Sequence, residues 1–210
     1  MPFSEKDSTL FWHGATSEEF SVGGTWQGMR RQRLVHLANT PPDTTTINLL
    51  LPNNRSGKDY TQQSTTLSTI SSITNISVAF VDKASRCYGC DCALQSTELR
   101  FSTPVAFHEH WRFKYLFDLD GAGFSSRSLP FLQSRSLVFR VAAFRQWFDE
   151  RLTAWVHFVP VDSRLRDVWG LLAYFGGTGT GGGRGHVGEA ERIAEGRRER
   201  AARVVRKEDM

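Results

Sequence analysis

Phe113-Lys-Tyr-Leu-Phe-Asp-Leu119, followed by Asp120-Gly-Ala-Gly-Phe-Ser-Ser126 and then Arg127, is the stretch that decides the fold. The apolar run 113–119 predicts a strand. The glycines in the next segment predict a turn over 120–126, and residues 127–134 predict a short helix. A strand that leads through a glycine-rich turn into a helix is one step of an α/β fold.

The same alternation continues after this unit. Strands are predicted at 136–141 and 155–161, and helices at 144–152 and 164–175. Short links between alternating strands and helices indicate a parallel sheet with right-handed crossovers. The expected fold class is therefore α/β, a Rossmann-like parallel sheet with flanking helices.

The flanking regions have weaker signals. Upstream, the apolar run 10–12 predicts a strand that ends in the turn 14–16, and residues 28–36 predict the start of a helix. Residues 38–76 are rich in Thr, Ser, Asn and Pro, which is typical of a long irregular insertion. Downstream, the glycine-rich run 176–185 lacks the Gly-Lys-Ser/Thr ending of a phosphate loop and is interpreted as a flexible connector.

Composition limits the possible functions. With 210 residues, 40% of them apolar, the chain suits one ordinary domain with a packed core. The net charge is +4, and the basic residues of 184–207 alternate with acidic ones, which is typical of a solvated helix and not of a nucleic-acid interface. The sequence contains no apolar run of roughly 18 residues that could span a membrane, and no signal-peptide pattern. The triplets at Asn54 and Asn75 fit the N-glycosylation acceptor pattern and so permit a secretory history.

Three cysteines, Cys87, Cys90 and Cys92, lie close together. His108 and His110 could nominally complete a set of zinc ligands, but the spacing fits no zinc module. One local disulfide with a spare thiol is the simpler interpretation. The sequence leaves the redox state of the three cysteines open.

The turn after the first-quoted strand has the residue types that a phosphate ligand needs. Gly121 and Gly123 let the backbone turn sharply and approach a ligand closely. Ser125 and Ser126 could cap the following helix and offer hydroxyl and amide donors to an anion. Arg127 supplies a fork that can hold two phosphate oxygens. An NAD site of the G-x-G-x-x-G type is disfavoured, because Ser126 stands where the last glycine is needed.

Three longer blocks together resemble glycosyltransferase family 90, the family of the fungal capsule-associated proteins and the animal protein O-glucosyltransferases. They are KYLFDLDGAGFSSRSLPFLQSRSLVFRV at 114–141, QWFDERLTAWVHFVPV at 146–161 and, upstream, LFWHGATSEEFSVGGTWQGMRRQRLV at 10–35. The resemblance extends over 8–37 and 77–207 and is most specific in 111–175.

The resemblance implies the C-terminal, donor-binding lobe of a GT-B glycosyltransferase. Such an enzyme transfers xylose or glucose from a UDP-sugar to a glycan or glycoprotein hydroxyl with inversion, in the secretory pathway and without a metal cofactor. The chain begins almost on the upstream block, so a truncated product that lacks the acceptor lobe is expected. The alternative is a non-catalytic or degenerate nucleotide-sugar binder.

Carried over by position, the resemblance implies that residues 122–127 line the UDP, with Arg127 on the diphosphate. It also implies that the turn 14–16 borders the sugar nucleotide. Arg31 is expected as the second phosphate-facing cation, with Arg30 and Arg33 as rivals. The candidate donor-site residues are Gly14, Ala15, Thr16, Arg31, Gly121, Ala122, Gly123, Phe124, Ser125, Ser126 and Arg127.

This reading divides the chain into segments. They are 1–37, the start of the donor-binding lobe; 38–76, the irregular insertion; 77–175, the UDP-sugar-binding core; 176–188, the linker; and 189–210, a polar helix. Two departures from the family pattern could weaken donor binding: His13 stands where the family has Arg, and Gln146 stands where relatives often have an acid.

Several other residues resemble functional motifs but have simpler roles. Asp118 and Asp120 imitate a metal-binding DxD motif, but Asp120 is expected to shape the turn and no metal is expected. The pair His108 and His110 is expected to be structural or on the surface, and His157 to be a core histidine. Trp147, Phe148 and Trp155 are expected in the core. No residue is identified as the catalytic base.

Overall fold

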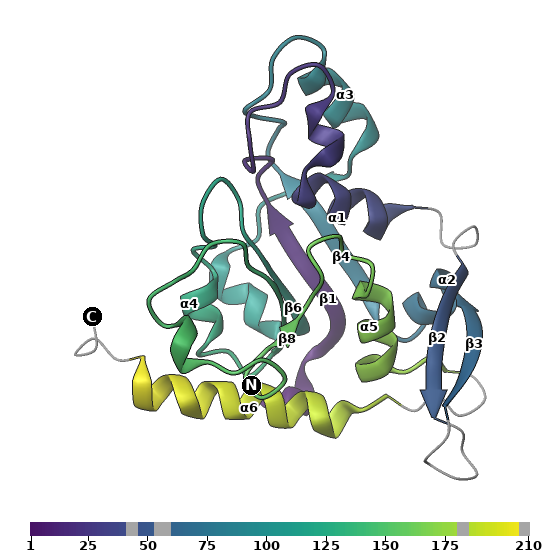
Figure 1. Cartoon of the computed structure of the whole chain (residues 1–210), viewed down its shortest axis with the longest axis vertical. Coiled ribbons are helices and arrows are strands. Elements are labelled where there is room, and N and C mark those ends of the chain that lie inside the picture. The colour runs from purple at the N-terminus through teal and green to yellow at the C-terminus, as the bar shows by residue number, and fades with distance from the viewer. Residues whose placement is uncertain (41–45, 53–59, 180–184, 206–210) are drawn as a thin grey trace.

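The central sheet has six strands in the order β5-β4-β1-β6-β7-β8, and every neighbouring pair is parallel (Figure 1). The computed structural model describes residues 1–40, 46–52, 60–179 and 185–205. The strands are β1 (Asp7–Gly14), β4 (Asn75–Val81), β5 (Phe101–Ser102), β6 (Phe113–Leu119), β7 (Leu137–Val141) and β8 (Val159–Pro160). This arrangement confirms the predicted Rossmann-like α/β class.

Helices flank the sheet on both faces. The α-helices are α1 (Arg30–Asn39), α2 (Leu67–Ser71), α3 (Asp91–Glu98), α4 (Ser128–Phe131), α5 (Val168–Gly176) and α6 (Val187–Val204). The short 3-10 helices are η1 (Phe3–Glu5), η2 (Thr25–Gly28), η3 (Phe107–Arg112) and η4 (Asp149–Arg151). The predicted strand 113–119 is confirmed at both ends, and the helix predicted at 164–175 begins four residues later, at Val168.

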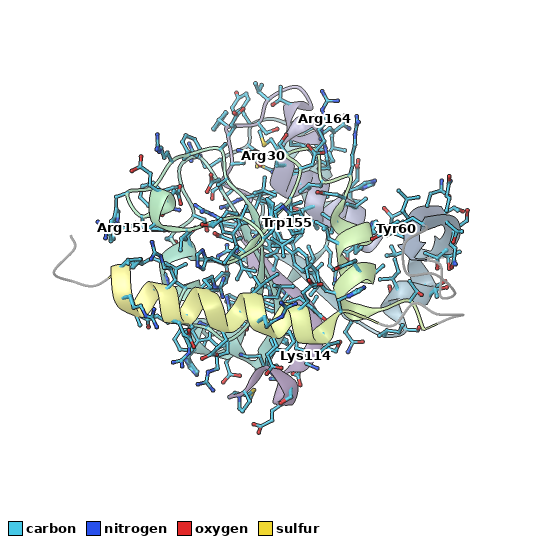
Figure 2. All side chains as sticks on the ribbon, turned by 60° about the horizontal axis from the view of Figure 1, so that its bottom comes forward. Arg30, Tyr60, Lys114, Arg151, Trp155 and Arg164 are labelled. Atoms are coloured by element: carbon cyan, nitrogen blue, oxygen red, sulfur yellow. A yellow bond between two sulfur atoms is a disulfide. The ribbon has the colours of Figure 1, made fainter. Side chains whose placement is uncertain are left out.

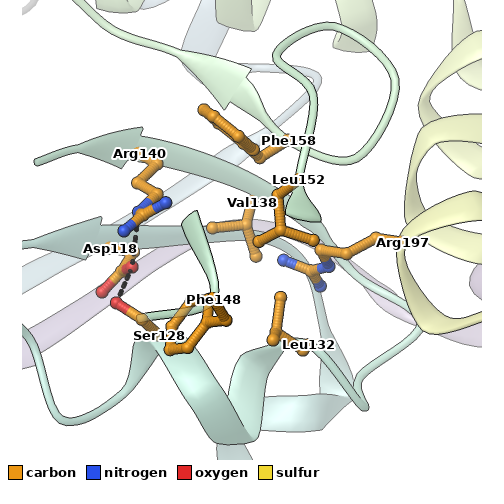
Figure 3. A pocket seen from close by; sticks show the side chains of 9 residues that line it. All are labelled: Asp118, Ser128, Leu132, Val138, Arg140, Phe148, Leu152, Phe158 and Arg197. Atoms are coloured by element: carbon orange, nitrogen blue, oxygen red, sulfur yellow. Dashed lines mark hydrogen bonds and ion pairs between the residues drawn. The ribbon is translucent and has the colours of Figure 1, made fainter. Parts of the chain in front are cut away.

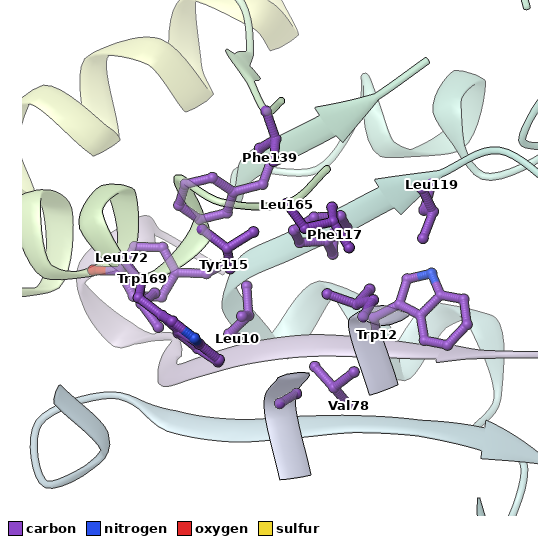
Figure 4. Close-up of a cluster of buried hydrophobic side chains, with 14 of the residues drawn as sticks. Leu10, Trp12, Val78, Tyr115, Phe117, Leu119, Phe139, Leu165, Trp169 and Leu172 are labelled. Carbon is purple, nitrogen blue, oxygen red and sulfur yellow. The ribbon is translucent and has the colours of Figure 1, made fainter. Parts of the chain in front are cut away.

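The larger hydrophobic core lies on one face of the sheet (Figure 4). Because side chains alternate along a strand, Leu10 and Trp12 of β1 and Phe117 of β6 point to the same face. Helices α1 and α5 pack onto this face, with Leu34 and Leu172 fully buried. Burial of a side chain of this size contributes roughly 1.5–3 kcal/mol, so this face supplies most of the apolar stabilisation.

The opposite face carries a smaller apolar cluster and two buried charges. The cluster consists of Phe11, Leu116, Phe131 and Val138. Asp118 of β6 and Arg140 of β7 are register partners on this face, and both are buried. Burial of a charge is costly unless a partner compensates it, so these two side chains depend on each other.

Helix α6 crosses the sheet at the end where the strands begin (Figures 1 and 2). Arg197 of α6 is buried, and its Nη2 donates to the carbonyl oxygen of Ser136 at 2.8 Å and to Oγ of Ser134 at 2.9 Å. Both serines lie directly before β7. A charged side chain of the last helix therefore satisfies the polar backbone at the start of a central strand.

Residues 38–76, expected to be irregular, contain regular structure in their described part. Strands β2 (Thr46–Pro52) and β3 (Tyr60–Thr66) form an antiparallel pair beside α5 (Figure 1). Leu49 is buried, and its side chain lies close to Gly170 of α5. The first acceptor triplet, at Asn54, lies outside the described residues.

The segment predicted as helix 144–152 and strand 155–161 has a different structure. Only Asp149–Arg151 is helical, as the 3-10 turn η4, and only Val159–Pro160 pairs with β7. A turn occupies the residues between them: the His157 amide donates to the Thr153 carbonyl, and His157 Nδ1 accepts from the Thr153 amide at 2.8 Å. Proline removes a backbone donor, so Pro160 is compatible with the edge position of β8.

None of the helices in the described part of the chain is both long enough and apolar enough to cross a membrane.

Candidate functional site

The candidate site lies where the order of the strands changes direction. After β1 the chain adds β4 and β5 on one side, and then β6, β7 and β8 on the other. The loops at the carboxyl ends of β1 and β6 therefore diverge, which leaves a crevice where α/β sheets bind ligands. A cavity of about 240 Å³ opens there. It is lined by Ser17, Arg31, Arg86, Gly121, Ala122, Gly123, Phe124, Ser125, Ser126 and Arg127.

Asp120 shapes the turn after β6, as expected. Its buried carboxylate accepts hydrogen bonds from the Ser125 amide at 2.8 Å and from the amides of Ala143 and Phe144 at 2.7 and 3.0 Å. One side chain thus fixes the turn after β6 against the loop after β7. This geometry uses the carboxylate inside the protein and explains an aspartate directly before the glycine.

Neither Ser125 nor Ser126 is the N-cap of the helix, so this prediction is wrong. Helix α4 begins at Ser128, and the side chain of its N-cap residue, Arg127, makes no capping hydrogen bond. The amide of Ser125 is not available to a ligand, because Asp120 accepts its hydrogen bond. In the described structure, the turn amides without a hydrogen-bond partner are those of Gly123, Phe124 and Ser126. All three residues are exposed and line the cavity, so these donors can face a ligand.

Arg31 is buried beneath the turn and is fixed by backbone oxygens. Its Nε donates to Asp120 O at 3.1 Å, and its Nη1 donates to Ala15 O at 3.0 Å. The guanidinium lies flat against Gly121: a Cβ at this position would be 2.6 Å from Arg31 Nη2. Glycine is therefore needed here for close packing of a cation and not for its backbone angle.

Arg127 lies against β1 in a similar way. Its guanidinium is 5.3 Å from the centre of the Trp12 ring, and a Cβ on Gly14 would be 2.6 Å from Arg127 Nη2. Burial, followed by the charge of Arg31, lowers the pKa of Arg127 to about 10. The side chain is therefore still cationic at neutral pH. A bound anion would relieve the repulsion between the two arginines.

The cavity lining is strongly positive. It includes three arginines and no carboxylate. Among the described residues, no carboxylate oxygen is within ion-pair distance of Arg127 or Arg86. Convergent guanidinium groups and free amides are the groups that bind phosphate oxygens in proteins.

The predicted residues of the turn 14–16 contact the residues that line the cavity, or lie near them. Gly14 lies beneath Arg127, and the carbonyl of Ala15 accepts from Arg31. The side chain of Thr16 is buried and faces Ser85, where its Oγ1 accepts from the Ser85 amide at 2.8 Å. None of these three positions lines the cavity itself.

The rival arginines of α1 face elsewhere. Arg30 Nε is 2.7 Å from Glu18 Oε1, and neither Arg30 nor Arg33 lines the cavity. His13 also faces away from the cavity, packed on Phe11 with ring centres 4.5 Å apart. Burial, with neighbouring arginines as lesser causes, lowers the pKa of His13. This histidine is therefore neutral at pH 7.

Asp118 belongs to a separate buried cluster behind the turn (Figure 3). Its Oδ2 accepts from Ser128 Oγ at 2.5 Å and lies 3.6 Å from Arg140 Nε. Arg140 Nη2 is also 2.7 Å from Asp149 Oδ1, which links β7 to η4. The space between these groups, about 10 Å³, has room for roughly one water molecule. Asp118 thus has structural partners in α4 and β7.

The remaining candidates have mixed outcomes. His110 is buried among aromatic rings, including Phe11 at 4.7 Å, while His108 is exposed. His157 lies in a turn and not in a strand. Trp147 and Trp155 are 45% and 54% exposed, so their expected place in the core is wrong. Phe148 is buried as expected.

The cysteines form one disulfide, Cys87–Cys92, and Cys90 is an exposed free thiol. No group of three or more potential metal ligands occurs in the described ranges.

Two cavity residues, Ser17 and Arg86, were not predicted. Ser17 directly follows the upstream turn, so extending that turn by one residue would have included it. Arg86 has no motif around it except the nearby cysteines. Only the fold brings it beside the turn that follows β6.

The fold and the cavity define a class: a Rossmann-like α/β protein with an arginine-lined cavity at the switch point of its sheet. Residues 1–199 match the profile of Glycosyl transferase family 90. The chain belongs to this family.

Several curated proteins are similar to this chain over short stretches. O-glucosyltransferase rumi of Drosophila melanogaster is 38% identical over 60 residues, 28% of this chain and 15% of that protein. Protein O-glucosyltransferase 1 of Rattus norvegicus is 37% identical over 67 residues, 31% of this chain and 17% of that protein. The O-glucosyltransferase rumi homolog of Anopheles gambiae is 39% identical over 74 residues, which are 34% of this chain and 18% of that protein. The chain therefore spans less than a fifth of the length of these relatives.

Proposed function

We propose that this chain is the UDP-sugar-binding lobe of a GT-B glycosyltransferase. The observation that carries the proposal is the cavity at the switch point, where Arg31 and Arg127 converge with the free amides of the 121–126 turn. A nucleoside diphosphate brings negative charge that such groups can match. Membership of the family and the similarity to O-glucosyltransferases support a sugar nucleotide as the ligand.

The proposed reaction transfers xylose or glucose to a glycan or glycoprotein hydroxyl with inversion. Cleavage of the sugar–phosphate bond leaves negative charge on the departing diphosphate. Arginines and amides that are already in place would stabilise this charge without a costly rearrangement. We expect these groups to act without a metal ion, so a chelator should leave UDP affinity unchanged.

The acceptor hydroxyl needs a base, and the cavity lining offers none. Its charged members are all arginines, and its remaining members are Ser, Gly, Ala and Phe. This observation favours a second candidate function, a nucleotide-sugar binder without turnover. Sugar transfer to an acceptor by the purified chain would exclude this second candidate.

We also propose a secretory location. The disulfide Cys87–Cys92 supports it, because disulfides persist in oxidising compartments and are rare in the cytosol.

Calorimetric titration tests the donor site. We expect UDP, UDP-xylose and UDP-glucose to bind and NAD not to bind. The Arg127→Ala variant should lose about 1.5–3 kcal/mol of UDP affinity, the range for hydrogen bonds to charged groups. Arg145→Ala is the matched control, because Arg145 is exposed and pairs with Glu150 away from the cavity. Equal UDP affinity in wild type and Arg127→Ala would contradict the proposal.

A further inference from the structure

Arg86 lines the cavity from a third side. It lies in the loop after β4, whereas Arg31 and Arg127 come from the segments after β1 and β6. Its side chain is exposed, and within the described residues it has neither an ion pair nor a hydrogen bond. Arg31, in contrast, donates to backbone oxygens. Arg86 is therefore a cation at the cavity whose donors are free.

The loop that carries Arg86 is fixed on both sides of this residue. On one side, Thr16 Oγ1 donates to the Ser85 carbonyl at 3.0 Å and accepts from the Ser85 amide at 2.8 Å. On the other side, the Ser21 amide donates to the Arg86 carbonyl at 2.8 Å, and the Tyr88 amide donates to the Ser21 carbonyl at 2.9 Å. These bonds hold the Arg86 backbone while its side chain remains free.

The disulfide closes the same loop directly after Arg86. It joins Cys87 to Cys92 in the first turn of α3. Next to Cys92, the buried Asp91 accepts from Ser21 Oγ at 2.5 Å and from the Gly24 amide at 3.0 Å, so α3 is tied to the loop after β1. Arg86 itself has φ = 55°, a left-handed conformation that is uncommon for a residue with a side chain. Such a conformation persists where the surroundings enforce it, and here they present the side chain to the cavity.

We propose that Arg86 is a third diphosphate-binding residue of the site, positioned by the Cys87–Cys92 disulfide. This inference rests on the proposed function, since it assigns a further contact to the same ligand. The Arg86 guanidinium has free donors at a cavity that is already lined by the cations of Arg31 and Arg127. It is therefore suited to charge-assisted hydrogen bonds with phosphate oxygens.

Titration with UDP, inorganic pyrophosphate and uridine tests the contact. Arg86→Ala should weaken UDP and pyrophosphate binding by roughly 12- to 30-fold, the lower part of the range for bonds to charged groups because the residue is exposed. Arg86→Lys should have intermediate affinity, since lysine keeps the charge and loses the fork. Uridine affinity should not change.

The control is Lys83→Ala, which removes the same charge from an exposed residue of the same loop that does not line the cavity. An equal loss in Lys83→Ala and Arg86→Ala would overturn the contact and leave only a general charge effect. Unchanged UDP affinity in Arg86→Ala, with normal binding by the wild type, would overturn this inference alone. A wild type that binds neither UDP nor pyrophosphate would overturn the proposed function as well.

The role of the disulfide is tested in a Cys90→Ser background, which prevents exchange with the free thiol. Dithiothreitol gives two electrons and two protons to the disulfide, which becomes two thiols while the reagent becomes its cyclic disulfide. Reduction should weaken UDP binding toward the level of Arg86→Ala, and should have little effect when Arg86 is already replaced. Equal weakening by reduction in the presence and absence of Arg86 would overturn the link between the disulfide and this residue.

Discussion

At two positions of the site only glycine leaves room for an arginine side chain that packs against the backbone. Gly121 lies over Arg31 and Gly14 lies beneath Arg127, and in both cases an added Cβ would be 2.6 Å from a guanidinium nitrogen. Neither glycine has a left-handed backbone. The sequence predicts that Gly121 lets the backbone approach a ligand closely, and that prediction stands. The structure adds a second close neighbour, the guanidinium of Arg31.

Gly121→Ala should destabilise the protein by roughly 1–3 kcal/mol, the usual cost of an overpacked site. Arg31 cannot move aside easily, since backbone carbonyls hold its guanidinium. Gly123→Ala is the control, because a Cβ there would meet no atom within 4 Å. Urea unfolding of both variants measures the difference. Equal stabilities of the two variants would contradict this packing argument.

At the scale of elements, the sequence predicts a strand or helix most accurately where burial of an apolar run decides its structure. The strand 113–119 is mostly apolar and buried in the sheet, and its predicted ends are correct. Residues 144–161 combine helix-forming and strand-forming types, but tertiary contacts decide their structure. Phe148 packs into a cluster with Leu132 and α6, and Trp155 has φ = 66°, which interrupts a strand. No local sequence pattern indicates the packing of Phe148 or the backbone angle of Trp155.

Helix α6 depends on one buried charge for its position. Arg197→Ala should destabilise the protein by about 1.5–3 kcal/mol, because the carbonyl of Ser136 would lose a charged donor in a buried place. Arg192→Ala, on the exposed side of the same helix, should change stability by less than about 0.5 kcal/mol. Thermal or urea unfolding distinguishes the two. A similar small effect for both variants would mean that α6 is held by its apolar contacts alone.

At the scale of the molecule, the site is made by three separate segments, those that follow β1, β4 and β6. The sequence predicted the 121–127 turn and Arg31 as neighbours through the family resemblance, and the fold places both at one cavity. Arg86 is far from both along the chain. Its position depends on where β4 joins the sheet, a tertiary property that no local spacing encodes.

The stability of the whole fold should depend on pH through a buried histidine. Burial, with the charge of Arg127 as the next cause, lowers the pKa of His110 to about 4, whereas the unfolded value is 6.5. Between these values the unfolded chain binds a proton that the folded chain does not. The contribution of His110 to stability is therefore complete above about pH 6.5 and decreases toward pH 4, by at most about 1.4 kcal/mol per pH unit.

Unfolding curves of wild type and His110→Gln between pH 4 and 7 should therefore converge as the pH falls. The difference between the two isolates His110 from other groups, such as Asp118, whose pKa burial raises and whose effect has the opposite sign. His108→Gln, at an exposed position two residues away, serves as the control for the substitution itself. A constant gap between wild type and His110→Gln would refute the assignment.

The position of α6 has a consequence for how the protein is made. Every strand of the sheet precedes Val187–Val204 in the chain, yet this helix covers the ends where those strands start and contacts η1 near the N-terminus. A nascent chain still held by the ribosome at this helix would leave the starting edge of its sheet uncovered, with apolar surface open to other chains. Completion of this sheet is thus tied to a segment that is synthesised after all of its strands.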